Sequence, residues 1–162
     1  MQVLIMYYSM GGRTKNMAEA IARGVHSVEG AACVIKAADE VTKEDLISSS
    51  ALIAGSPSYL GTMAADLKKV FEKNIGIRDK MCGKVGAAFA GAAETPGGAE
   101  TTLLSIIQAM LIYGMVIAGT PVSTASGYYG AAITGNTGGG VTDRDSFELG
   151  RNVVLLAMKL SK

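Results

Sequence analysis

The sequence predicts an α/β fold, a doubly wound parallel sheet of five strands in the order 2-1-3-4-5 with helices on both faces. Five short apolar runs alternate with helical patterns along the 162 residues. The runs are apolar on both faces, as in parallel strands that helices cover from both sides. This alternation predicts a single domain, residues 1–162, and five strands favour that order.

The strands are expected where the apolar runs are short and bounded by turn-forming or polar residues. Most of the 21 glycines fall between these runs, where turns need them. The expected strands are residues 3–8, 32–37, 51–55, 85–90 and 115–118.

Helical periodicity fills the intervals between the strands. Residues 98–113 are apolar nearly all round, which predicts a central helix, and small and apolar residues recur over 14–28. Three threonines stand where helix-capping side chains are expected, the first and last of them in a Thr-x-x-Asp pattern. These are Thr42, Thr62 and Thr142, the last ahead of a helix that ends near residue 160.

Composition narrows the class of protein. Charge is almost balanced, with 15 Lys and Arg against 14 Asp and Glu, so we expect no nucleic-acid partner held by a basic surface. Cys33 and Cys82 have no metal-ligand spacing and predict two reduced thiols in a cytoplasmic protein. We expect no signal peptide, because the N-terminus reads as a strand without a basic flank or a small-residue cleavage site. We expect no membrane span, because polar residues and a glycine interrupt the most apolar stretch, 103–119.

Three loops are expected to meet at one edge of the sheet. In such folds ligands bind outside the carboxyl ends of the strands, near the point where the strand order reverses. The loops that follow the first, third and fourth strands are rich in Ser, Thr, Gly or Pro. They read SMGGRT from Ser9, SPSYLGT from Ser56 and GAAETPGGAE from Gly91.

The first loop has the composition of a phosphate site. Ser9 and Thr14 supply hydroxyl groups, Gly11 and Gly12 let backbone N–H groups approach closely, and Arg13 supplies positive charge. The helix N-terminus that follows favours an anion by up to roughly 1–2 kcal/mol. A turn that only caps the helix is the alternative.

The second loop suits a flat ring. Pro57 stiffens the turn, Ser56 and Ser58 offer polar edges, and Tyr59 and Leu60 can cover an aromatic face. A helix-capping loop with a surface tyrosine is the alternative.

The third loop offers backbone donors over residues 92–95 and the carboxylate of Glu94. The alternative is that it serves only as a glycine-permitted entry into the next helix.

Several other kinds of site on this type of sheet are excluded by the sequence. The chain has no G-x-x-x-x-G-K-[ST] sequence, and no G-x-G-x-x-G follows the first strand. Neither cysteine has an arginine six positions later, which excludes a phosphatase loop. The acidic residues of a receiver domain are also missing.

Five segments together resemble the WrbA-like flavoproteins of the flavodoxin superfamily. They are, in order, YYSMGGRTKNMA, GSPSYLGTMAADLKKVF, GAAETPGGAETT, YGMVIAG and YYGAA, within a resemblance that runs from Met1 to about Leu160. The resemblance implies a flavodoxin-like fold and FMN as cofactor. It also implies NAD(P)H as reductant, a quinone or similar acceptor, and a homo-oligomer, either dimer or tetramer.

Carried over by position, the resemblance implies three groups of FMN-binding residues. Those around the phosphate would be Ser9, Met10, Gly12, Arg13 and Thr14. Those lining the isoalloxazine would be Pro57, Ser58, Tyr59, Leu60, Gly61 and Thr62. Those flanking the ring edge and ribityl chain would be Ala92, Ala93, Glu94, Thr95 and Gly97.

Tyr113 is the candidate catalytic residue, because it falls where family members often carry a histidine beside the open face of the ring. It would stack against the substrate or donate a hydrogen bond to it. A tyrosine that packs in the core is the alternative. Tyr59 stands in place of a usual arginine, and the chain is shorter than typical members.

An electron-carrying flavodoxin with no substrate site is the main alternative function. Such carriers are usually acidic and often flank the ring with Trp, whereas this chain has a net charge of +1 and no Trp. A non-redox binding module on the same sheet is a third hypothesis. Tyr128 and Tyr129, expected after the fifth strand, could cover the flavin or form a subunit contact.

Overall fold

The computed structural model describes residues 1–120, 127–135 and 140–161. Its strands are β1 (Gln2–Tyr7), β2 (Ala32–Ala37), β3 (Ala51–Tyr59), β4 (Thr62–Met63), β5 (Val85–Ala92), β6 (Val116–Ile117) and β7 (Ala131–Thr134). Its helices are α1 (Arg13–His26), α2 (Lys43–Ser48), α3 (Ala65–Lys73), α4 (Arg78–Met81), α5 (Ala99–Ile112) and α6 (Gly140–Leu160), with 3-10 turns η1 (Ala38–Glu40) and η2 (Ile75–Ile77).

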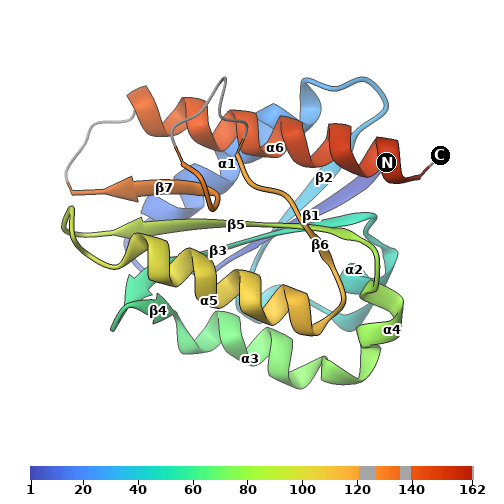
Figure 1. Ribbon diagram of the computed structural model, residues 1–162, viewed down its shortest axis with the longest axis horizontal. Helices are drawn as coiled ribbons and strands as arrows, with labels where there is room; N and C mark the ends of the chain where they lie inside the picture. Colours follow the sequence, from blue (N-terminus) through green and yellow to red (C-terminus); the bar gives the residue numbers. More distant parts are fainter. Residues whose placement is uncertain (121–126, 136–139, 162) are drawn as a thin grey trace.

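The central sheet confirms the predicted strand order. Its strands run β2-β1-β3-β5-β6, and all of them pair in parallel. β7 also pairs in parallel with β5, so β6 and β7 share the fifth position (Figure 1). No helix in the described ranges combines the length and apolarity needed to cross a membrane.

Helices cover both faces of the sheet, and each face has its own apolar core. α1 and α6 lie on one face, α3 and α5 on the other (Figure 1). Val3 and Ile5 of β1 enter the first core, whereas Leu4 and Met6 enter the second. Successive side chains of a strand point to opposite faces, so burial on both sides explains why the run is apolar throughout.

The predicted capping box at Thr42 is present, but two other expected caps are wrong. Thr42 Oγ1 accepts a hydrogen bond from the Asp45 N–H at 3.2 Å, and the Asp45 carboxylate accepts one from the Thr42 N–H at 2.8 Å. Thr62 lies in strand β4, and helix α3 begins three residues later. Thr142 lies inside α6, which begins at Gly140.

Strand β3 is longer than expected and ends in a hairpin. It continues through Tyr59, and a two-residue turn at Leu60 and Gly61 leads into β4, where Thr62 pairs with Tyr59. Leu60 and Gly61 both have positive φ, 51° and 76°, as a type I′ hairpin turn requires.

The fifth strand position is divided between two short strands. β6 pairs with the beginning of β5, Val116 opposite Val85, and β7 pairs with its end, Ala131 opposite Phe89. The expected strand at 115–118 is therefore only the first half, and Tyr128 and Tyr129 precede the second half.

Helices α1 and α6 approach each other closely at Gly24. A Cβ atom at this position would lie 1.9 Å from the carbonyl oxygen of Phe147. That atom belongs to helix backbone, so the overlap can be relieved only by separating the two helices.

We predict that Gly24→Ala lowers the free energy of unfolding by roughly 2 kcal/mol or more, because overpacking outweighs the better helix propensity of alanine. Urea denaturation followed by circular dichroism measures the change. Gly76→Ala is the control, since an added Cβ meets no atom within 4 Å. Equal stability of the two variants would refute the close packing.

Candidate functional site

The structure brings the three loops together at the carboxyl edge of β1, β3 and β5. Tyr7 pairs with Gly55, and Pro57 pairs with Gly91, so the three strands end side by side. Two hydrogen bonds then join the loops to one another. Arg13 Nη1 donates to the carbonyl oxygen of Ala92 at 3.0 Å, and the Ser58 hydroxyl donates to that of Gly97 at 2.8 Å.

The first loop leaves the N-terminus of helix α1 open to a ligand. Gly12 precedes the helix with a φ of 83°, no side chain caps it, and the first turn contains no acidic residue. A Cβ atom at Gly11 or Gly12 would meet no atom within 4 Å, so the space over this backbone is open. Uncapped first-turn N–H groups carry partial positive charge, which suits an anion.

The side chains of the first loop differ in their accessibility. Met10 is 80% exposed, whereas Thr14 is buried. Arg13 is half-buried, and no carboxylate in the described ranges forms an ion pair with it. The accessible part of the loop therefore combines open backbone with the Arg13 cation, which pairs with no carboxylate of the described residues.

The β3–β4 hairpin forms an aromatic and apolar wall beside the first loop. Tyr59 is partly exposed and Leu60 fully exposed. Tyr8 packs edge-on against Tyr59, with 6.2 Å between ring centroids. Tyr8 has no role in the site that the sequence predicts. An aromatic residue between a strand and a glycine-rich loop was a signal that it could belong to a ligand site.

The third loop lies beside the hairpin, with Ala93, Glu94, Thr95 and Pro96 exposed. Gly97 and Gly98 lead into helix α5 and are held to the hairpin through the Ser58 hydroxyl. The loop therefore presents backbone polar groups and one carboxylate beside the aromatic wall.

Two residues expected to contact a ligand are fully engaged within the protein. Ser56 is 0% exposed; its hydroxyl donates to Pro57 O at 2.7 Å and accepts from the Ala64 N–H at 2.8 Å. Ala92 is buried at the end of β5, and its carbonyl oxygen accepts from Arg13 and from the Gly135 N–H. Both residues hold the loops in place, and their side chains offer no surface to a ligand.

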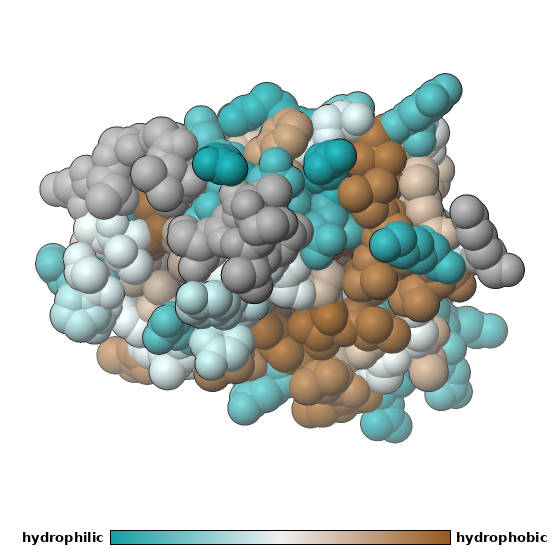
Figure 2. Space-filling view, turned by 45° about the horizontal axis from the view of Figure 1, so that its top comes forward, coloured by the Kyte–Doolittle hydropathy of each residue, from teal (hydrophilic) through white to brown (hydrophobic). Residues whose placement is uncertain are grey.

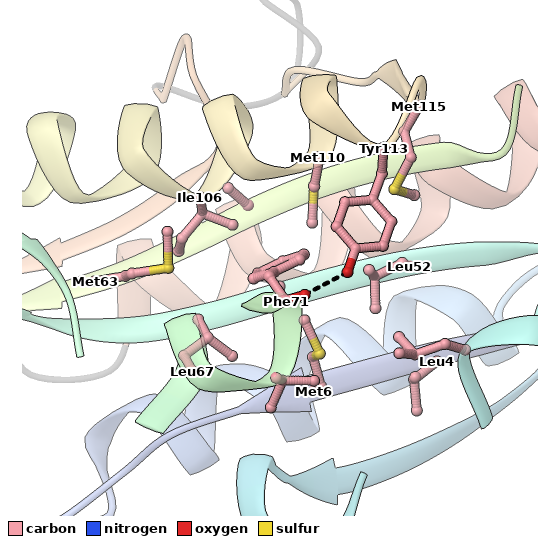
Figure 3. Close-up of a cluster of buried hydrophobic side chains, with 14 of the residues drawn as sticks. Leu4, Met6, Leu52, Met63, Leu67, Phe71, Ile106, Met110, Tyr113 and Met115 are labelled. Atoms are coloured by element: carbon pink, nitrogen blue, oxygen red, sulfur yellow. Dashed lines mark hydrogen bonds between the residues drawn. The ribbon is translucent and has the colours of Figure 1, made fainter. Parts of the chain in front are cut away.

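Tyr113 does not lie among the three loops, where its expected contact with a ring would require it. It follows the C-terminus of α5, close to the beginning of strand β5, at the opposite edge of the sheet. Its ring packs edge-on against Phe71, and its hydroxyl donates to the Phe71 carbonyl oxygen (Figure 3). Burial raises the pKa of Tyr113 to about 12, so the hydroxyl remains a donor at neutral pH.

Two cavities open beside the loops. One, of about 460 Å³, lies between the first loop, at Ser9 and Gly12, and the acidic residues Asp39 and Asp66. The other, of about 500 Å³, lies between Thr95 on the third loop and Tyr128. No group of three His, Cys, Asp or Glu residues suited to a metal ion occurs among the described residues.

A doubly wound sheet with an open helix N-terminus after its first strand defines the class of α/β proteins in which ligands bind at the switch point of the sheet. Residues 5–95 match the family described as Flavodoxin, more than half of the chain. The chain belongs to the flavodoxin family.

Relatives of this chain include proteins named as quinone dehydrogenases and as flavodoxins. An NAD(P)H dehydrogenase (quinone) from Gluconacetobacter diazotrophicus is 34% identical, with 99% of this chain and 98% of that protein covered. A flavodoxin from Aquifex aeolicus is 32% identical, with 83% and 75% covered. The crystal structure of a flavodoxin, WrbA-like protein from Agrobacterium tumefaciens has a TM-score of 0.78 at 24% identity, with 98% of both chains covered, and supports the fold.

We predict that Tyr113→Phe lowers the free energy of unfolding by about 1 kcal/mol, the usual contribution of one hydrogen bond. Because the residue lies at the opposite edge of the sheet, flavin affinity should stay within a factor of two of wild type. Denaturant unfolding and a flavin titration on the same preparation measure both quantities. A large loss of flavin affinity with unchanged stability would show that Tyr113 takes part in flavin binding.

Proposed function

We propose that the protein binds FMN across the three loops and transfers two electrons from NAD(P)H through this cofactor to a quinone or similar acceptor. One observation carries the proposal: the open N-terminus of α1 lies directly beside the partly exposed aromatic wall of the β3–β4 hairpin. FMN is a ligand that joins a phosphate to a flat ring.

The residues present fit the chemistry of FMN. Gly11, Gly12 and Arg13, with the Ser9 hydroxyl, would hold the phosphate, because they combine open backbone, positive charge and a hydroxyl donor. Tyr59 and Leu60, with Pro57, Ser58, Gly61 and Thr62, would form the wall beside the ring. The exposed third loop, Ala93 to Gly97, would bind its polar edge.

FMN, when bound, supplies the redox chemistry, accepting a hydride equivalent and passing two electrons on. The chain would position and orient the cofactor. The Ser58 hydroxyl ties the hairpin to the third loop and so fixes the separation between two walls of the site. The exposed side chains of Met10 and Leu60 provide apolar surface beside the site. Arg13 spans from the first loop to the end of β5.

An enzyme is favoured over an electron carrier. The quinone dehydrogenase relative is covered over 98% of its own length, and the net charge of this chain is +1, whereas carriers of this family are usually acidic. We further propose a cytoplasmic homo-oligomer. Exposed apolar side chains at the sheet edge and the end of α6, Val116, Leu155 and Leu160, support a subunit contact, and Figure 2 shows apolar surface on this side of the molecule.

The phosphate position is tested by Gly11→Asp. A carboxylate at the helix N-terminus would repel the phosphate, so we expect the Kd for FMN to rise about tenfold or more. The protein itself should be equally stable or slightly more stable, because a negative charge at this end of a helix is favourable. Fluorescence titration with FMN and thermal unfolding measure the two effects.

Two controls accompany this variant. Riboflavin, which has no phosphate, should bind Gly11→Asp and wild type with similar Kd. Gly76→Asp places the same charge at an exposed glycine in η2 and should not change FMN affinity. If riboflavin and FMN weaken equally, the phosphate does not lie at this loop.

The activity is tested by adding NADH or NADPH to the FMN-loaded protein without oxygen. We expect either nucleotide to bleach the flavin absorbance within the time of a turnover, and a benzoquinone to restore it. FMN binding without bleaching by either nucleotide would identify a carrier instead. If FMN does not bind, the proposed function fails and only the assignment of the fold stands.

A further inference from the structure

An apolar groove lies on the face of the molecule covered by α3 and α5. It has a volume of about 500 Å³ and runs between these two helices. Thr62 and Met63 of the β3–β4 hairpin stand at one end, and Ile75 and Ile112 at the other. The groove therefore begins at the same hairpin that forms the aromatic wall of the flavin site.

The groove suits an uncharged, apolar occupant. Its apolar and aromatic lining comes from Met63, Phe71, Ile75, Ala109, Ile112 and Tyr113. Met63 and Phe71 form its floor, because both belong to the buried core between the two helices (Figure 3). The charged residues among its lining, Lys68 and Glu72, form an ion pair with each other. A charged ligand would therefore find no unpaired opposite charge here.

The Ser105 hydroxyl, in the middle of the groove, is already engaged within the protein, so it offers no free partner to a peptide. The Ser105 hydroxyl accepts from the Met63 N–H at 3.0 Å and donates to the Thr102 carbonyl oxygen at 2.7 Å. An extended peptide needs partners for its own N–H and C=O groups, whereas a hydrocarbon chain needs none. The stretch of α5 from Ser105 to Ile112 is about 10 Å long, enough for a short alkyl or prenyl chain.

We propose that this groove binds the hydrocarbon side chain of the quinone acceptor, so that the preferred acceptors are quinones with an alkyl or prenyl tail. The inference rests on the proposed quinone reduction at the three loops. The quinone head would lie at the hairpin, beside Tyr59 and Thr62, and the tail would extend between α3 and α5 to Ile112.

The test compares 2,3-dimethoxy-5-methyl-1,4-benzoquinone with its 6-decyl derivative, which has the same head and an added tail. Calorimetric Kd values on the FMN-loaded, oxidised protein are measured first, and KM values with NADH or NADPH second. Burying one methylene changes affinity about threefold to fourfold, so a tail in the groove should lower both constants about tenfold or more. Equal constants for the two quinones would overturn the proposal.

Two exposed neighbours on α5 provide a matched pair of variants. Ile112 is 62% exposed and lines the groove, whereas Leu111 is 56% exposed and does not. Ile112→Gln should reduce the advantage of the decyl quinone about fivefold and leave the affinity for FMN and for the short quinone unchanged. Leu111→Gln should retain the full advantage. An equal loss in both variants would indicate nonspecific adhesion and overturn the proposal.

Two further readings separate this inference from the proposed function and from a subunit contact. If neither quinone is reduced but the decyl quinone still binds more tightly in an Ile112-dependent way, the groove is supported and the reductase activity is not. If the short quinone is reduced without any tail effect, the activity stands and the groove proposal fails. If Ile112→Gln alone dissociates an oligomer, as seen by sedimentation velocity, a second copy of the chain occupies the groove. That result would refute the binding of a quinone tail there.

Discussion

The pairing of β3 with β5 is the interaction on which the rest of the molecule depends. Seven consecutive residue pairs join the strands, from Ala51 opposite Val85 to Pro57 opposite Gly91. At the centre of this pairing the buried ring of Phe89 occupies the space that a side chain at Gly55 would need. Helices close over both faces of the paired strands, so their register decides where the loops at the carboxyl edge stand relative to each other.

The candidate site is rigid because its loops are attached to the paired strands β3 and β5. Arg13 connects the start of α1 to the end of β5, and Ser58 connects the hairpin to the turn before α5. Each of these hydrogen bonds is modest by itself. Together they join three loops whose own backbones have few regular partners, so the loops need little reorganisation when a ligand binds. Ser56 and Ala92, expected to touch the ligand, belong to this support.

Much of the fold could be predicted because its signals are local and repeated. Two-sided apolar runs indicated parallel strands, and the Thr42 capping box marked the start of α2. The hairpin was missed because Pro57 resembled a loop residue, although it lies in β3 at its last pairing with β5. The split fifth strand was missed because β6 is two residues long, too short for a periodic pattern. The strand order was enough to predict that the loops converge. The hydrogen bonds that join them could not be predicted, because they link residues distant in sequence.

By itself the sequence determined the class of fold, the edge of the sheet where a ligand would bind and the residue types gathered there, because strand periodicity and strand order are enough for these. Only the tertiary structure decided which of those residues face open space. Tyr113 shows the difference: position along the chain placed it beside the ring, whereas the direction of α5 carries it to the opposite edge of the sheet, against Phe71. A helix between parallel strands runs antiparallel to them, so its two ends lie at opposite edges of the sheet.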